Sequence, residues 1–150
     1  MSTVIDTPDG IAFYRLAALK GALDLQTKGM KLSRGRSATS IGKAQYGLRR
    51  NTASGQYPIV AKQVEDIISL REVAPAMVSW LGYQFQLAYN AAFDDHNHEP
   101  TLGQVEAEVM KLTEPTPAEK TALLTLARVW DFESRCLPAV RIMFRDVKPA

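Results

Sequence analysis

Apolar residues recur along the chain at the three- and four-residue spacing of α-helices, and no long segment alternates with the two-residue period of a strand. Short runs of glycine, proline, serine and threonine separate these segments, and such residues end helices. The sequence therefore predicts an all-α fold, a single compact domain over residues 1–150 with short connections between its six or seven helices. The expected helices cover residues 8–28, 38–46, 57–72, 75–93, 101–112, 117–135 and 139–147.

The first expected helix is apolar on two sides. Thr7 and Pro8 suit its start, and Gly29 suits its end. A helix that is apolar on two sides usually lies between neighbours, so we expect this helix at the centre of the fold. One stripe contains Ile11, Tyr14, Ala18, Ala22 and Leu25, and the other contains Phe13, Leu16, Leu19 and Leu23.

The longest uncharged stretch, residues 73–93, has the length of a membrane span. It contains Pro75, Gly82 and several amide side chains, and it lacks the basic flank that marks the cytoplasmic end of a span. The first ten residues also lack the features of a signal peptide. We therefore expect a cytoplasmic protein without a membrane partner. The stretch is expected to form a bulky core helix or to lie partly in an interface with another protein or a second copy.

Charge is spread unevenly along the chain. The net charge is +2, but residues 1–50 hold nine Lys/Arg against three Asp/Glu, whereas residues 51–150 hold nine against thirteen. Residues 29–50 contain no acidic residue, and Lys28 precedes them. Such asymmetry indicates a basic face for phosphate or for an acidic partner.

Within this basic stretch Ser37 is expected to cap the next helix, and the amide groups at a helix N-terminus attract anions. We predict a site for nucleic acid or another polyanion, with phosphate contacts that mostly do not read sequence. A docking surface for an acidic protein and a solvated basic face are the alternatives. The residues of the predicted site are Lys31, Arg34, Arg36, Ser37, Lys43, Arg49 and Arg50.

Other chemistry is weakly represented. Residues 94–99 contain Asp94, Asp95, His96, His98 and Glu99, which are all metal-ligand types. His96 and His98 lie two residues apart and do not share a helix face, so a polar connector is favoured over a metal site or a metal-dependent enzyme. The chain has no glycine-rich phosphate loop and no nucleophile motif. We therefore predict a non-enzymatic protein without catalytic residues, metal or cofactor.

Cys136 is the only cysteine, so the chain cannot form an intramolecular disulfide. A single thiol without a basic partner is usually a small buried apolar residue. We expect Cys136 to be buried on a helix.

Residues 7–66 contain a recurring set of helix starts, glycines and basic positions, formed by Thr7, Pro8, Gly10, Ile11, Arg15, Leu16, Leu19, Lys20, Gly29, Met30, Lys31, Ser37, Ala38, Ile41, Lys43, Gly47 and Leu48. In these residues the segment resembles a family of short phage, prophage and bacterial proteins of unknown function, and residues 70–150 form a helical extension beyond the resemblance. The resemblance implies a small phage-type protein. With the basic stretch it indicates a nucleic-acid or polyanion binder in the host cytoplasm. The alternative is a protein–protein module, either a virion component or an effector of a host complex.

Overall fold

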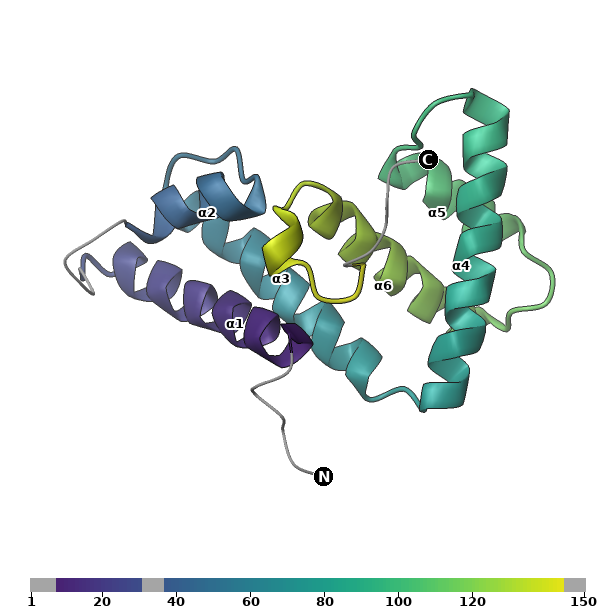
Figure 1. The fold of residues 1–150 in the computed structure, drawn as a ribbon, viewed down its shortest axis with the longest axis horizontal. Coiled ribbons are helices and arrows are strands. Elements are labelled where there is room, and N and C mark those ends of the chain that lie inside the picture. The colour runs from purple at the N-terminus through teal and green to yellow at the C-terminus, as the bar shows by residue number, and fades with distance from the viewer. Residues whose placement is uncertain (1–7, 31–36, 145–150) are drawn as a thin grey trace. The chain divides into compact units, whose positions relative to one another are not determined.

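The computed structural model describes residues 8–30 and 37–144 and confirms the all-α fold class. These residues form six α-helices, one short 3₁₀ helix and no strand (Figure 1). The elements are α1 (Pro8–Thr27), α2 (Ala38–Tyr46), α3 (Ala53–Arg71), α4 (Pro75–His96), α5 (Leu102–Lys111), α6 (Pro117–Ser134) and η1 (Pro138–Val140).

The helices are divided between two compact units, and the division falls within α3 and within α6. Of the described residues, unit 1 holds 8–30, 37–65 and 132–144, and unit 2 holds 66–131. In these ranges unit 1 has nine Lys/Arg and four Asp/Glu, a balance of +5, and unit 2 has four and ten, a balance of −6. The charge asymmetry of the sequence therefore follows the two units. The number of domains stays a prediction.

In unit 1, α1 contacts α2 and η1 through one of its two apolar stripes. Leu16, Leu19 and Leu23 are buried, as expected. The prediction that the second stripe is also buried is wrong, because Tyr14 is 62% exposed and Ile11 is 37% exposed. Leu16, Leu19 and Leu23 fill the space between α1 and the rest of unit 1. The alanines of the second stripe have small side chains, which offer little surface for packing.

Three helix starts are confirmed by their capping hydrogen bonds. Ser37 accepts from the Ser40 amide at 3.2 Å. Thr101 and Gln104 form a capping box, in which the Gln104 amide donates to Thr101 Oγ1 at 3.3 Å and the Thr101 amide donates to Gln104 Oε1 at 3.0 Å. The same reciprocal pair of bonds joins Thr116 to Glu119. These starts depend only on neighbouring residues, so the sequence is enough to predict them.

The expected start of the third helix at residue 57 or 58 is wrong, because α3 begins at Ala53. Thr52 caps it by accepting from the Gly55 amide at 3.1 Å. Pro58 lies inside the second turn and does not open the helix. A proline there removes only one early helical hydrogen bond, which a well-capped helix tolerates.

Two further boundaries differ from the prediction. The fourth helix continues through Asp94 to His96, because Asn97 adopts a left-handed conformation (φ 56°) and its amide donates to Phe93 O at 2.7 Å. The predicted helix over residues 139–147 is wrong for the part that the structure describes: η1 ends at Val140, Arg141 is extended, and residues 142–144 form a bend. The cause is Glu133, whose carboxylate accepts the amides of Ile142, Met143 and Phe144.

Unit 2 is built on the contact between α4 and α5 and on an aromatic cluster. Trp130 from α6 lies 6.1 Å from Phe85 and 5.5 Å from Tyr89, both on α4, measured between ring centroids. At the edge of this core Arg128 donates two hydrogen bonds to the buried carboxylate of Asp66, at 3.1 and 3.2 Å. Within the described ranges no helix combines the length and the hydropathy needed to cross a membrane.

Candidate polyanion-binding surface

The described part of the predicted site lies on α2 and on the segment that joins it to α3. Ser37 caps the first turn of α2, and Lys43 is exposed near its last turn. The buried residues of α2 are Gly42 and Tyr46, whereas Ile41 is half-buried and Ala44 is exposed. Lys43 lies on the solvent side of the helix.

Gly47 ends α2 and sets the direction of the segment that follows. It has a φ of 63°, which a side chain disfavours, and the Leu48 amide donates to Gly42 O at 3.1 Å. A Cβ at Gly47 would lie 2.5 Å from the carbonyl oxygen of Arg135. The Leu137 amide also donates to Gln45 O at 2.9 Å. The end of α2 is thus fixed against the segment that follows α6 in unit 1.

The buried amide of Gln56 holds α2 and the joining segment together. Its Nε2 donates to Arg50 O at 2.9 Å and to Thr39 O at 3.1 Å, and the residue is fully buried. Its Oε1 faces Gly42 and has no hydrogen-bond partner among the described atoms. A Cβ at Gly42 would overlap this oxygen, so glycine at 42 is what allows the amide to reach both carbonyls.

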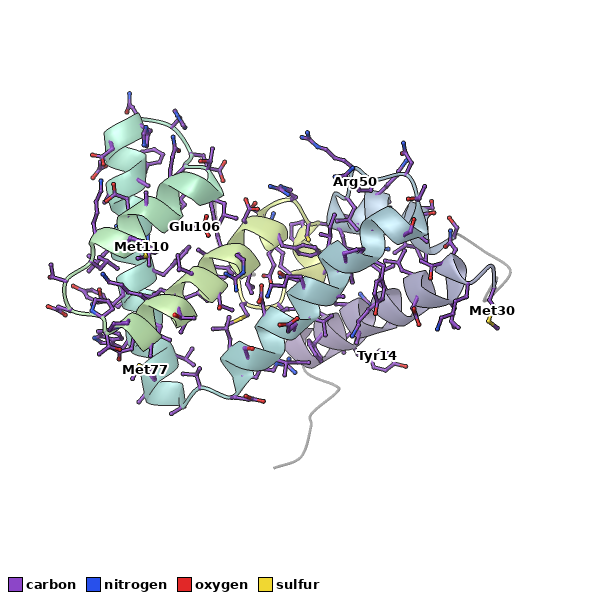
Figure 2. All side chains as sticks on the ribbon, turned by 180° about the vertical axis from the view of Figure 1, so that it is seen from behind. Tyr14, Met30, Arg50, Met77, Glu106 and Met110 are labelled. Atoms are coloured by element: carbon purple, nitrogen blue, oxygen red, sulfur yellow. The ribbon has the colours of Figure 1, made fainter. Side chains whose placement is uncertain are left out.

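Arg49 and Arg50 follow Leu48 and are both exposed. Figure 2 shows Arg50 on the outside of the chain. The Arg50 side chain begins against the first turn of α3, because a Cβ at Gly55 would lie 3.1 Å from Arg50 Cβ. Among the described residues neither arginine has an ion-pair partner. The backbone of Arg50 is therefore held by Gln56 while its guanidinium is available to solvent.

The side chain of Lys43 on α2 lies next to the segment that carries Arg49 and Arg50. Its Nζ donates to Oδ1 of Asn51, the residue after Arg50. The acidic residues nearest in sequence to this segment are Asp24 and Glu65. Lys28 differs from Lys43, Arg49 and Arg50, because it pairs with Asp24 at 3.2 Å. In the described ranges none of these three cations forms an ion pair with a carboxylate, and the structure places Lys43 beside the segment that carries the two arginines.

The remaining predicted residues are placed differently. Ser37 lies at the opposite end of α2, about 14 Å along the helix axis from Gly47, and its hydroxyl already accepts from the Ser40 amide. Lys31, Arg34 and Arg36 lie outside the described residues.

Sequence reasoning missed the two residues that position the surface, Gln56 and Gly42. Gln56 stands in a polar run that resembles an ordinary connector, and its partners are main-chain oxygens, which leave no mark in a sequence. The only available signal was a glycine inside a short amphipathic helix, which often marks a close approach.

The other candidate chemistry does not assemble in the described residues. His96 and His98 approach each other with ring centroids 5.9 Å apart, but no group of three metal-ligand side chains forms in the ranges that the structure covers. Cys136 is buried, as expected, but it lies in the bend after α6 and not on a helix, because α6 ends at Ser134. Burial raises the pKa of its thiol to about 12, with the neighbouring Glu133 charge acting in the same direction. Burial likewise raises the pKa of Tyr46 to about 12. These groups are therefore poor nucleophiles or bases near neutral pH.

Comparisons with protein-family models, with curated proteins and with solved structures give no match. The resemblance of residues 7–66 to phage and prophage proteins stays a prediction.

Proposed function

We propose that this chain is a non-enzymatic, phage-type protein that binds the phosphate backbone of nucleic acid through the surface formed by Lys43, Arg49 and Arg50. The proposal is supported chiefly by the two adjacent arginines, which are exposed and have no acidic partner among the described residues. Lys31, Arg34 and Arg36 precede the same helix in sequence and would extend the contact.

The pre-positioned backbone supports this proposal over a merely solvated basic face. An arginine on an unconstrained loop must be ordered when it binds, which costs side-chain and backbone entropy. Here the Gln56 amide already fixes the Arg50 carbonyl, and the packing against Gly55 directs the start of the side chain. Folding has therefore already ordered part of the arginine segment, so less entropy is lost on binding. The guanidinium keeps its five donors for phosphate oxygens.

The test is binding of labelled duplex DNA, single-stranded DNA and RNA across a salt series. Each phosphate contact contributes about −0.9 to the slope of log K against log salt on duplex DNA. The double variant R49E/R50E is expected to bind more weakly and to lower the magnitude of that slope by about 2. Equal affinity and equal slope for the double variant and the wild type would refute the proposal.

A matched control separates a local surface from a general effect of charge. Lys62 and Lys111 are exposed, and each pairs with a carboxylate three residues away. The variant K62E/K111E changes the net charge by the same amount as R49E/R50E but leaves the arginine pair in place. It is expected to bind with a salt slope close to that of the wild type. If both variants lose binding equally, net charge and not this surface drives the association.

A further inference from the structure

Leu137 presents an apolar side chain from a fixed backbone beside the end of α2. Its amide donates to Gln45 O at 2.9 Å, and its carbonyl oxygen accepts from the Val140 amide at 3.1 Å. The nearby residues Cys136 and Val140 are buried, whereas Leu137 is 52% exposed. Pro138 follows and restricts the backbone of Leu137 further. Both main-chain polar groups of Leu137 are therefore bonded within unit 1, while its side chain is open to solvent.

The hydrogen bond to Gln45 places Leu137 beside the segment that carries the proposed phosphate contacts. Gln45 lies two residues after Lys43 on α2, and Arg49 and Arg50 follow the end of that helix. Figure 1 shows η1, in yellow, beside α2 in unit 1. The exposed leucine and the three cations therefore gather around the C-terminal end of α2.

From this arrangement we infer that Leu137 inserts between base pairs of duplex DNA while Lys43, Arg49 and Arg50 hold the adjoining phosphates, an inference that rests on the proposed function. Aliphatic side chains and prolines act as wedges that partly unstack a base step and kink the duplex. A single exposed leucine is common on protein surfaces. This leucine differs in its fixed backbone, which needs no ordering on binding and can hold the side chain against the stacked bases.

The side chains around this surface favour a duplex over a single strand. Proteins that hold single strands stack the bases on aromatic rings. Within the described part of unit 1 the exposed aromatic side chain is Tyr14 on α1, and Figure 2 shows it on the opposite edge of the unit from Arg50. Residues 31–36, which precede α2, contain no aromatic residue. A single strand would therefore meet charge without an exposed stacking platform, whereas a kinked duplex uses both the cations and the leucine.

The test is binding of the full-length chain to a duplex of about 25 base pairs that carries a donor and an acceptor dye at its two ends. The wild type is expected to raise the energy transfer between the dyes, because wedges kink DNA by about 20–90°. L137A is expected to bind about 10-fold more weakly and to leave the energy transfer near that of free DNA. Its salt slope should equal that of the wild type, because no phosphate contact is lost. L87A is the matched control, since Leu87 is 40% exposed but lies on α4 in unit 2, and it is expected to behave like the wild type.

A duplex with a central mismatch provides a second readout. A mismatched base pair costs less to unstack, so the wild type is expected to bind this duplex more tightly than the matched one, and L137A is expected to lose the preference. Circular dichroism would show that each variant keeps its helices.

The outcomes separate this inference from the proposed function. An L137A variant that keeps the wild-type energy transfer and mismatch preference would overturn insertion, as would tighter binding of single-stranded DNA than of duplex by the wild type. In either case a reduced salt slope in R49E/R50E would still support the phosphate-binding surface. If R49E/R50E keeps the wild-type slope, the proposed function fails and this inference fails with it.

Discussion

The carboxylate of Glu133 is expected to contribute more to the stability of unit 1 than any surface charge in the described chain. Only 2% of the residue is exposed to solvent. Its Oε1 accepts hydrogen bonds from the backbone amides of Ile142, Met143 and Phe144 at 2.9–3.1 Å. E133A would leave the buried Ile142 amide without its partner, while the other two amides can turn to water. A buried donor left without a partner costs roughly 1–3 kcal/mol, and each hydrated amide costs less, so E133A is expected to lower the free energy of unfolding by about 2–4 kcal/mol.

The matched variant is E133Q, because the geometry allows its oxygen to replace the carboxylate. All three amides reach Oε1, and Oε2 accepts from Met143 at the longer distance of 3.2 Å. A glutamine oxygen in the Oε1 position would keep three bonds, so we expect a loss below about 1.5 kcal/mol. Denaturant unfolding followed by circular dichroism measures both variants. Hydrogen exchange at residues 142–144 should accelerate in E133A but only slightly in E133Q.

The free energy of unfolding should also depend on pH through this residue. Burial raises the pKa of Glu133 above its ordinary value of 4.5, although the three backbone amides and Arg141 act in the opposite direction. The folded chain therefore keeps a proton that the unfolded chain releases once the pH exceeds 4.5. This stabilising contribution is complete below 4.5 and is lost as the pH rises through the raised pKa. The stability difference between wild type and E133Q should shrink over that window. A constant difference, or an E133A variant within about 0.5 kcal/mol of the wild type, would refute this account of Glu133.

Two more outcomes follow from individual residues. G47A should destabilise the chain by about 1–2 kcal/mol or more, because alanine disfavours a φ of 63° and its Cβ would meet the Arg135 carbonyl. In contrast, G21A in the middle of α1 should stabilise it by about 0.5–1 kcal/mol; equal effects in thermal unfolding would contradict the steric argument. The thiol of Cys136, with a pKa of about 12, should resist alkylation at mildly alkaline pH until denaturant is added. Rapid labelling of the native protein would show that the thiol is accessible.

Much of the fold could be predicted from the sequence because its signals are local. The caps at Ser37, Thr101 and Thr116 use partners three residues away, and Gly29 and Gly47 end helices through their own backbone conformation. The same signals fail where distant residues intervene. The apolar spacing after Val140 predicts a helix, yet the Glu133 carboxylate accepts the amides of Ile142, Met143 and Phe144, and this segment forms a bend.

The candidate site could be predicted only in part. Composition alone identifies Lys43, Arg49 and Arg50 as members of a basic stretch, since charge is visible in a sequence. The grouping of these residues on one surface depends on Gln56 of α3. Its side-chain amide donates to the main-chain oxygens of Thr39 on α2 and of Arg50 on the joining segment. Such a contact depends on the three-dimensional approach of α2 to α3, and no periodicity or motif records it.

The hydrogen bonds of Gln56 determine which positions of this surface can vary. Because the amide binds the main-chain oxygens of Thr39 and Arg50, its two hydrogen bonds place no demand on the side chains at those positions. Residues 42 and 56 have no such freedom, since one must lack a Cβ and the other must donate twice. A saturation library selected for folding should therefore accept many residues at 39 and 50 and very few at 42 and 56. Related chains could then change what they recognise by exchanging the side chain at position 50 while keeping the loop that presents it.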